Sequence, residues 1–197
     1  MIQSIRYSLF CYSSVPCSLE PIPQTYKYYR NVRDSWTSNT CGGSCNQINT
    51  FRLNPQYLIS LPNTNNINNI NNINHHHSHS HGNNRSNSPH TTLFDKTNLR
   101  FSLSCLQPLD INIMVFCNQG QPIHLPAKEL MITSTGNYRR CFSMCKLSSQ
   151  ELTYFQKDFT HSIFPLTVVL SNFSGSLGDF EFRVESTHTL IELKKIV

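Results

Sequence analysis

Residues 164–186 read FPLTVVLSNFSGSLGDFEFRVES and contain two strand-like patterns on either side of a turn. In the second half, Phe180, Phe182 and Val184 alternate with charged residues, which is the period of a strand that buries one face. In the first half, apolar residues also recur at every second position. Between the halves, Ser-Gly-Ser-Leu-Gly at 174–178 is typical of a turn. The stretch therefore predicts two consecutive strands separated by a turn.

The same period of two recurs along much of the remaining chain. Turn residues, such as Gln-Pro-Leu-Asp at 107–110 and Ser-Thr-Gly-Asn at 134–137, separate these segments. Only residues 146–157 are compatible with a short helix. Seven or eight short strands at this spacing predict an all-β fold, an antiparallel β-sandwich whose two sheets each bury one face. The further predicted strands lie at residues 57–61, 99–105, 111–115, 138–147 and 189–193.

The composition limits the classes of function. The chain has 197 residues, a formal net charge of +5 and only 14% charged residues. Because its basic residues form no run, a nucleic-acid partner is not expected. No apolar run reaches the ~18 residues of a transmembrane helix. The first residues lack a signal-peptide pattern, so we expect an intracellular, cytoplasmic protein whose eight cysteines are reduced thiols.

Residues 63–92 differ from the rest of the chain, beginning with NTNNINNINNINHHHSHSH. Such a polar segment buries too little apolar area to offset the entropy of ordering it, so we predict a disordered, low-complexity insertion. Residues 1–25 are predicted to be poorly structured, and residues 26–197 to form the sandwich that the insertion interrupts. The weak metal-binding candidates are His75, His76, His77, His79 and His81, for which an expansion without a metal is the preferred interpretation.

No pattern of catalytic residues emerges elsewhere. The cysteine pairs 41/45 and 141/145 are spaced more widely than the usual zinc knuckle, and an extended strand would place Cys141 and Cys145 about 13 Å apart. No cysteine begins a convincing helix, as the nucleophile of a papain-like protease does. The aspartates are too scattered for a calcium site. We therefore expect no catalytic residue, no structural metal and no cofactor in this chain.

A second informative stretch is WTSNTCGGSCNQINTFRLNPQYLISLP, residues 36–62. Its order of Trp, Gly-Gly, Thr-Phe and Asn-Pro-Gln-Tyr resembles the start of calpain domain III. The resemblance continues through residues 134–147 and 164–186, and the tail at 187–197 is similar to the end of the atypical PalB-like calpains. Ser44 departs from the pattern, since the family usually has Cys there. The positions that carry the resemblance are Trp36, Gly42, Gly43, Asn54, Pro55, Tyr57, Tyr138, Arg139, Gly178, Phe180 and Phe182.

The resemblance implies a non-catalytic, C2-like structural and regulatory domain of a calpain-like cysteine endopeptidase of peptidase family C2. Such a domain is expected to brace the protease core in cis and to contact acidic phospholipid or protein partners. Because this chain lacks the Cys-His-Asn protease core, the resemblance also implies a fragment of a longer protein. The basic residues available for acidic headgroups are Arg139, Arg140, Lys194 and Lys195. The alternative is a free-standing C2-like module that binds lipid or protein and has no protease connection.

The CGGSC stretch at 41–45 is interpreted as a backbone turn and not as a thiol site. At least one of Gly42 and Gly43 is expected to need a positive φ. Trp36 is expected to bury its ring and to find a partner for its indole N–H. Replacing either glycine by Val is expected to destabilise the domain, whereas Cys45→Ser is expected to be nearly silent.

Overall fold

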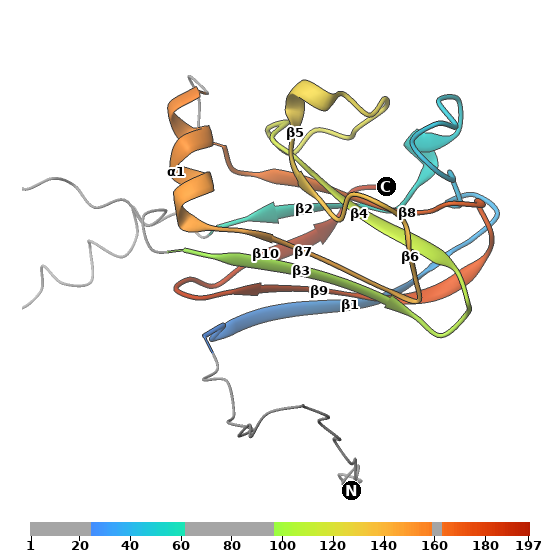
Figure 1. Ribbon diagram of the computed structural model, residues 1–197, viewed down its shortest axis with the longest axis horizontal. Helices are drawn as coiled ribbons and strands as arrows, with labels where there is room; N and C mark the ends of the chain where they lie inside the picture. Colours follow the sequence, from blue (N-terminus) through green and yellow to red (C-terminus); the bar gives the residue numbers. More distant parts are fainter. Residues whose placement is uncertain (1–24, 62–96, 159–162) are drawn as a thin grey trace, which may run out of the picture.

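The computed structural model describes residues 25–61, 97–158 and 163–197. These residues form two antiparallel β-sheets packed face to face, with one α-helix beside them, as Figure 1 shows. The predicted all-β sandwich is therefore confirmed. Apart from Thr25, the expectations for residues 1–25 and for the insertion with its five histidines concern residues outside the described part of the chain.

The two sheets divide the strands unequally. Sheet A has the order β1-β9-β3-β7, and sheet B has the order β10-β2-β8-β4-β5, with the short β6 paired to β4. The strands of sheet A are β1 (Tyr28–Trp36), β9 (Gly178–Ser186), β3 (Leu99–Cys105) and β7 (Phe142–Leu147). Those of sheet B are β10 (Glu192–Lys195), β2 (Gln56–Ser60), β8 (Leu166–Asn172), β4 (Asp110–Phe116), β5 (Met131–Ser134) and β6 (Arg139–Arg140).

The described residues contain ten strands, more than the seven or eight predicted. The sequence pattern does not predict β1 or β5, and the strand predicted at 138–147 is divided into β6 and β7. β1 lies at the edge of sheet A and pairs with β9 alone. Most of its residues are exposed or half-buried, so its sequence shows only a weak alternation of apolar and polar residues. Cys141 divides β6 from β7 because its φ of 61° interrupts the extended backbone.

The two strands predicted within residues 164–186 are present as β8 and β9, but they do not pair with each other. β8 lies in sheet B between β2 and β4, whereas β9 lies in sheet A between β1 and β3. The turn between them therefore crosses from one sheet to the other. Asn172 holds this turn, because its amide donates to the Ser176 carbonyl and accepts from the Ser176 N–H, both at 2.9 Å. Two strands adjacent in the sequence thus lie on opposite sides of the core.

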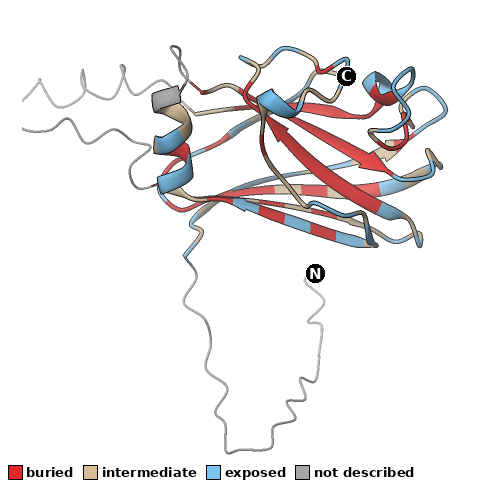
Figure 2. Ribbon diagram, turned by 45° about the horizontal axis from the view of Figure 1, so that its top comes forward, coloured by how far each residue is buried: buried red, intermediate tan, exposed pale blue. Residues whose placement is uncertain are grey.

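The outer faces of the two sheets also differ, as Figure 2 shows. Along β7 in sheet A, exposed and buried residues alternate strictly. In sheet B, β8 is buried at every position and β4 at every position but the first. A second apolar cluster accounts for this burial and contains Phe51, Met114, Phe116, Ile123 and Val169. The expectation that each sheet buries only one face is therefore wrong for sheet B.

The helix α1 spans Ser149–Asp158 and confirms the short helix predicted at 146–157. A capping box begins it: the Glu151 N–H donates to Ser148 Oγ at 3.2 Å, and the Ser148 N–H donates to the Glu151 carboxylate at 2.7 Å. Leu152 is fully buried and anchors the helix to the core. No helix in the described part of the chain is long and apolar enough to cross a membrane.

Candidate functional site

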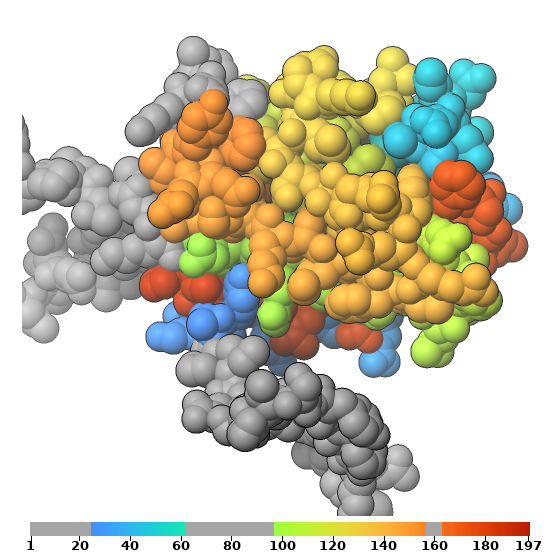
Figure 3. Space-filling model, viewed as in Figure 1, coloured from blue at the N-terminus to red at the C-terminus, as the bar shows by residue number. Residues whose placement is uncertain are grey.

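Four loops meet at one end of the sandwich, which we call the loop end. It consists of residues 37–55, 106–109, 135–141 and 173–177. The Phe173 N–H donates to the Asp110 carbonyl at 2.8 Å, and the Cys141 N–H donates to the Leu109 carbonyl at 2.9 Å. The Tyr138 and Phe173 rings pack edge to face, with centroids 5.4 Å apart. In Figure 3, the cyan part of the 37–55 loop and the red-orange 173–177 loop lie side by side.

The Gly-Gly pair forms a tight turn at this end. Gly43 has a φ of 74°, in the left-handed region, as the turn interpretation requires. Gly42 has no room for a side chain, because a Cβ there would lie 2.8 Å from the Asn54 backbone nitrogen and closer still to the Thr50 carbonyl oxygen. Thr50 Oγ1 donates to the Gly42 carbonyl at 2.8 Å, and Asn54 Nδ2 donates to the carbonyls of Gly43 and Phe51, both at 2.9 Å. These side chains bind backbone, so the motif serves the turn.

Trp36 ties the two sheets together beside this turn. Its side chain is only 1% exposed, and its ring lies 4.5 Å from that of Phe180. The indole N–H donates to the Leu170 carbonyl of β8 at 3.1 Å, so the partner comes from the opposite sheet. The N–H of Leu170 in turn donates to the Pro55 carbonyl at 3.0 Å. The expected burial and hydrogen-bond partner of Trp36 are both present.

Tyr57 takes part in a polar contact between the sheets that the sequence does not predict. Its hydroxyl donates to Asp34 Oδ2 at 2.5 Å, and Lys195 Nζ lies 2.6 Å from the same oxygen. Burial alone would raise the pKa of Asp34, but hydrogen bonds from Lys195, Tyr57 and the Ser35 N–H outweigh it and lower the pKa below its usual range. We call these three side chains, Asp34, Tyr57 and Lys195, the inter-sheet clasp.

The remaining predicted positions also lie in or beside the core. The Tyr138 hydroxyl is 3.0 Å from Ser171 Oγ, and burial raises the pKa of this tyrosine. Gly178 faces Trp36 across the β1–β9 ladder, and Phe182 packs 5.5 Å from the Tyr57 ring. Among the predicted positions with side chains, only Arg139 is exposed. The structure therefore brings these residues together as parts of the fold.

A buried glutamine is a further positioning residue that the sequence does not single out. Gln56 is 0% exposed, and its amide exchanges two hydrogen bonds with the backbone of Ile123, at 2.7 and 2.8 Å. These bonds hold the loop that covers sheet B. The only local signal is a polar residue between Pro55 and the buried Tyr57.

The exposed surface of the loop end combines apolar and basic side chains. None of its four loops contains Asp or Glu, although the exposed Asp110 and Asp179 border it. Neither Arg139 nor Arg140 forms an ion pair within the described residues. The exposed apolar residues are Ile48 (58% exposed), Leu53 (38%), Leu106 (97%), Phe173 (55%) and Leu177 (61%), and the exposed arginines are Arg52, Arg139 and Arg140.

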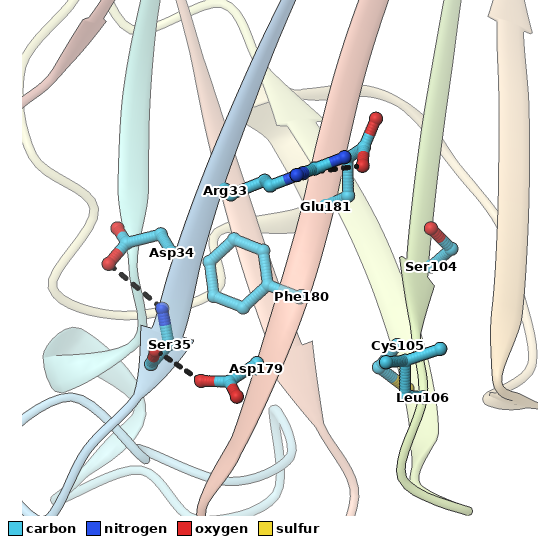
Figure 4. Close-up of a pocket in the computed structure, with 9 residues that line it drawn as sticks. All are labelled: Arg33, Asp34, Ser35, Ser104, Cys105, Leu106, Asp179, Phe180 and Glu181. Carbon is cyan, nitrogen blue, oxygen red and sulfur yellow. Dashed lines mark hydrogen bonds and ion pairs between the residues drawn. The ribbon is translucent and has the colours of Figure 1, made fainter. Parts of the chain in front are cut away.

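A pocket of about 610 Å³ lies on sheet A next to the loop end (Figure 4). Arg33 pairs with Glu181 at 3.1 Å across its floor, and Ser35 Oγ donates to Asp179 at 2.6 Å. The polar groups of this pocket therefore already pair with one another. The lining residues are Arg33, Asp34, Ser35, Ser104, Cys105, Leu106, Asp179, Phe180 and Glu181.

Three of the described thiols are kept in the protonated form by burial. Burial raises the pKa of Cys105, Cys117 and Cys145, the last to about 12, so these thiols stay protonated at neutral pH. Cys141 lies in the bend between β6 and β7 and not in an extended strand, which corrects the geometry expected for the 141/145 pair. Within the described ranges, no group of three or more His, Cys, Asp or Glu side chains is placed to hold a metal ion.

Comparison with known proteins relates this geometry to a family. Residues 32–98 match the family model described as calpain large subunit, domain III. The described part of that segment comprises most of β1, the Gly-Gly turn, the 3₁₀ helix η1 (Phe51–Leu53) and β2. No curated protein matches the chain. Calpain domain III is a non-catalytic domain of calpain proteases, and the match lies in the part of the chain that carries Trp36 and the Gly-Gly turn.

Proposed function

We propose that this sandwich is an accessory domain of a calpain-like intracellular cysteine endopeptidase, which braces the protease core in cis. The observation that carries the proposal is the match of residues 32–98 to calpain domain III. The use of Trp36, Gly42 and Asn54 for backbone contacts fits a structural part of a larger protein. The proposal includes a relationship to the PalB-like calpains and a longer parent protein, of which this chain is one part.

The size of the endogenous protein tests this proposal. An antibody raised against the sandwich should precipitate a protein well above 22.7 kDa, whose peptides include a Cys-His-Asn protease block. The purified 197-residue chain should show no thiol-dependent cleavage of casein. An endogenous protein of 22.7 kDa, or cleavage that is lost on replacing one cysteine, would contradict the proposal.

The loop end supports a second function, contact with an anionic phospholipid surface. Exposed apolar side chains such as Leu106 and Phe173 can enter the headgroup region, while basic side chains are attracted to acidic lipids. Arg139 and Arg140 are free for this role because no carboxylate within the described residues pairs with them. A protein partner with an acidic surface would be an alternative outcome of the test below.

The same loops favour a contact that does not need calcium. Ca²⁺ takes six to eight oxygen ligands, several of them carboxylates. The four loops of the loop end contain no Asp or Glu, so carboxylates could come only from its border, where Asp110 and Asp179 lie on different strands. We therefore propose that binding to anionic vesicles occurs in the presence of a calcium chelator.

Co-flotation with vesicles tests the lipid contact. The chain should float with phosphatidylserine-containing vesicles in EGTA, and should not float with phosphatidylcholine alone. Arg139→Glu with Arg140→Glu should reduce the partition coefficient at least about tenfold, since each basic residue contributes roughly 1 kcal/mol. The control, Lys27→Glu with Arg30→Glu, makes the same charge change near the opposite end of β1 and should have less effect. Equal losses in both pairs, or no flotation in EGTA, would refute the lipid contact and leave the accessory-domain proposal intact.

A further inference from the structure

We propose that Cys105 and Cys141 form a redox-sensitive thiol pair, which low-molecular-weight disulfides convert to an intramolecular disulfide. The two cysteines are 36 positions apart in the sequence, and the fold brings them together at the open end of sheet A. The last pair of the β3–β7 ladder is Ser104 opposite Phe142, so Cys105 and Cys141 are the next residues beyond this pair, with Cys141 in the bend that precedes β7.

The backbone of the two cysteines is already in contact. The Cys105 N–H donates to the Cys141 carbonyl at 3.0 Å, which continues the ladder by one bond. Directly opposed residues of antiparallel strands have Cβ atoms about 4.5–5.5 Å apart, and the positive φ of Cys141 turns its Cβ away from the position of a regular strand residue. A disulfide needs a Cβ separation of about 3.5–4.5 Å, so a small approach at these strand ends is sufficient.

The two sulfur atoms point toward the same place. Cys105 Sγ lies 3.2 Å from the Gln107 carbonyl oxygen, and Cys141 Sγ lies 3.6 Å from the same oxygen. Because both sulfur atoms lie this close to one oxygen atom, they are no more than about 7 Å apart. No such shared contact joins either thiol to Cys117 or Cys145, which are buried in the core.

The pair is also accessible to a small oxidant. Both cysteines are half-buried, and Cys105 is one of the residues that line the pocket on sheet A. The next residue, Leu106, is 97% exposed, so no packed layer covers this end of β3. By contrast, Cys145 is 7% exposed and Cys117 is 5% exposed. Among these four thiols, access thus favours the proposed pair.

The reaction is a thiol–disulfide exchange with oxidised glutathione. The thiolate of one cysteine attacks a sulfur of oxidised glutathione, forms a mixed disulfide and releases one molecule of reduced glutathione. The second thiol loses its proton and attacks the protein sulfur of that mixed disulfide, which releases the second glutathione. Two protein thiols are oxidised while one glutathione disulfide is reduced. Because the pKa of Cys105 is raised, the exchange is slow, and the pair responds to sustained oxidation.

Peptide mapping of the oxidised chain tests the proposal. The full chain is incubated overnight with oxidised glutathione, its free thiols are alkylated, and it is cut with trypsin and with a protease that cleaves before Asp110. We expect a cross-link between residues 101–109 and 141–146, and a melting temperature about 5 °C or more above that of the reduced chain.

Three variants identify the sulfurs. Cys105→Ser and Cys141→Ser should each abolish the cross-link, whereas Cys145→Ser, which changes the other cysteine of the second peptide, should retain it. Loss of the cross-link in Cys145→Ser would overturn the proposal. In the unsubstituted chain, glutathione adducts on Cys105 or Cys141 without a cross-link would overturn it as well, whether or not the variants fold.

Discussion

The Gly-Gly turn permits a quantitative test of why position 42 requires glycine, either because a side chain has no space or because the backbone conformation excludes one. Gly42 lies outside the positive-φ region, so Ala would meet only steric conflict, with the Asn54 nitrogen 2.8 Å from the new Cβ and the Thr50 carbonyl closer. Overpacking of this kind costs about 1–3 kcal/mol. Displacing the Gly42 and Gly43 carbonyls also weakens their bonds from Thr50 and Asn54, at about 1 kcal/mol each. Lower entropy of the unfolded chain offsets about 0.4–1 kcal/mol of this.

We therefore expect Gly42→Ala to lower the free energy of unfolding by about 3 kcal/mol and the melting temperature by roughly 6–12 °C. Urea denaturation followed by fluorescence measures the change, because Trp36 is the single tryptophan and is 1% exposed. Far-UV circular dichroism checks that the transition reports the whole sandwich.

Two control variants separate the causes. Gly136 has a φ of 72°, but no heavy atom lies within 4 Å of the position that a Cβ would take there, so Gly136→Ala tests backbone conformation alone and should cost about 1 kcal/mol. Cys45→Ser changes a half-buried thiol in the same loop and should cost less than about 1 kcal/mol. If Gly136→Ala or Cys45→Ser proved more damaging than Gly42→Ala, the steric account of the turn would be refuted.

Three further predictions concern contacts within and between the sheets. Trp36→Phe should lower the free energy of unfolding by about 2–4 kcal/mol, because it shrinks a fully buried ring and leaves the Leu170 carbonyl without the indole donor. Urea denaturation followed by circular dichroism measures this change. A decrease below about 1 kcal/mol would contradict the role assigned to Trp36. Tyr57→Phe should lower the free energy of unfolding by about 1–3 kcal/mol, because it removes the hydrogen bond to Asp34. An unchanged stability in the same assay would show that the inter-sheet clasp does not stabilise the fold. The hydrogen bond from Arg100 lowers the pKa of Glu185, and the pKa of Asp34 is also lowered. Because these two carboxylates take up protons at a higher pH in the unfolded chain than in the folded chain, acid favours unfolding. The free energy of unfolding should therefore be at its full value above about pH 5 and should fall as the pH drops below it. In the Asp34→Asn variant, the urea midpoint should change less between pH 5 and pH 3 than it does in the unsubstituted chain. An equal change in both chains would show that Asp34 does not contribute to the pH dependence of stability.

Some strands could be predicted because their signal is local. In sheet A, the outer face is open to solvent, so residues such as Phe180 and Phe182 must alternate with polar residues along the strand. The capping box at Ser148 and Glu151, with which α1 begins, is also a local pattern. Positive φ at one residue of the Gly-Gly pair follows from the same kind of short-range chemistry.

The candidate site was less predictable from the sequence. The motif of residues 36–57 predicts a turn and a buried Trp, but it does not indicate that Leu170 supplies the partner of the indole. The inter-sheet clasp joins Asp34 to Lys195, which are nearly the whole described chain apart. No local pattern marks such a pair, because each residue alone is an ordinary polar group at a strand edge. The same holds for Cys105 and Cys141, which share one carbonyl only in the folded chain.

The sequence by itself determined the all-β class, the position of most strands, the tight turn at Gly42 and Gly43, and the family resemblance that the match at residues 32–98 supports. Only the tertiary structure decided that β8 and β9 lie in opposite sheets, that loops bury the outer face of sheet B, and which thiols and charges meet at the loop end. The physical reason is that the alternation of apolar and polar residues along a strand depends only on which of its two faces is buried. Which strand becomes its neighbour depends instead on contacts between residues far apart in the chain.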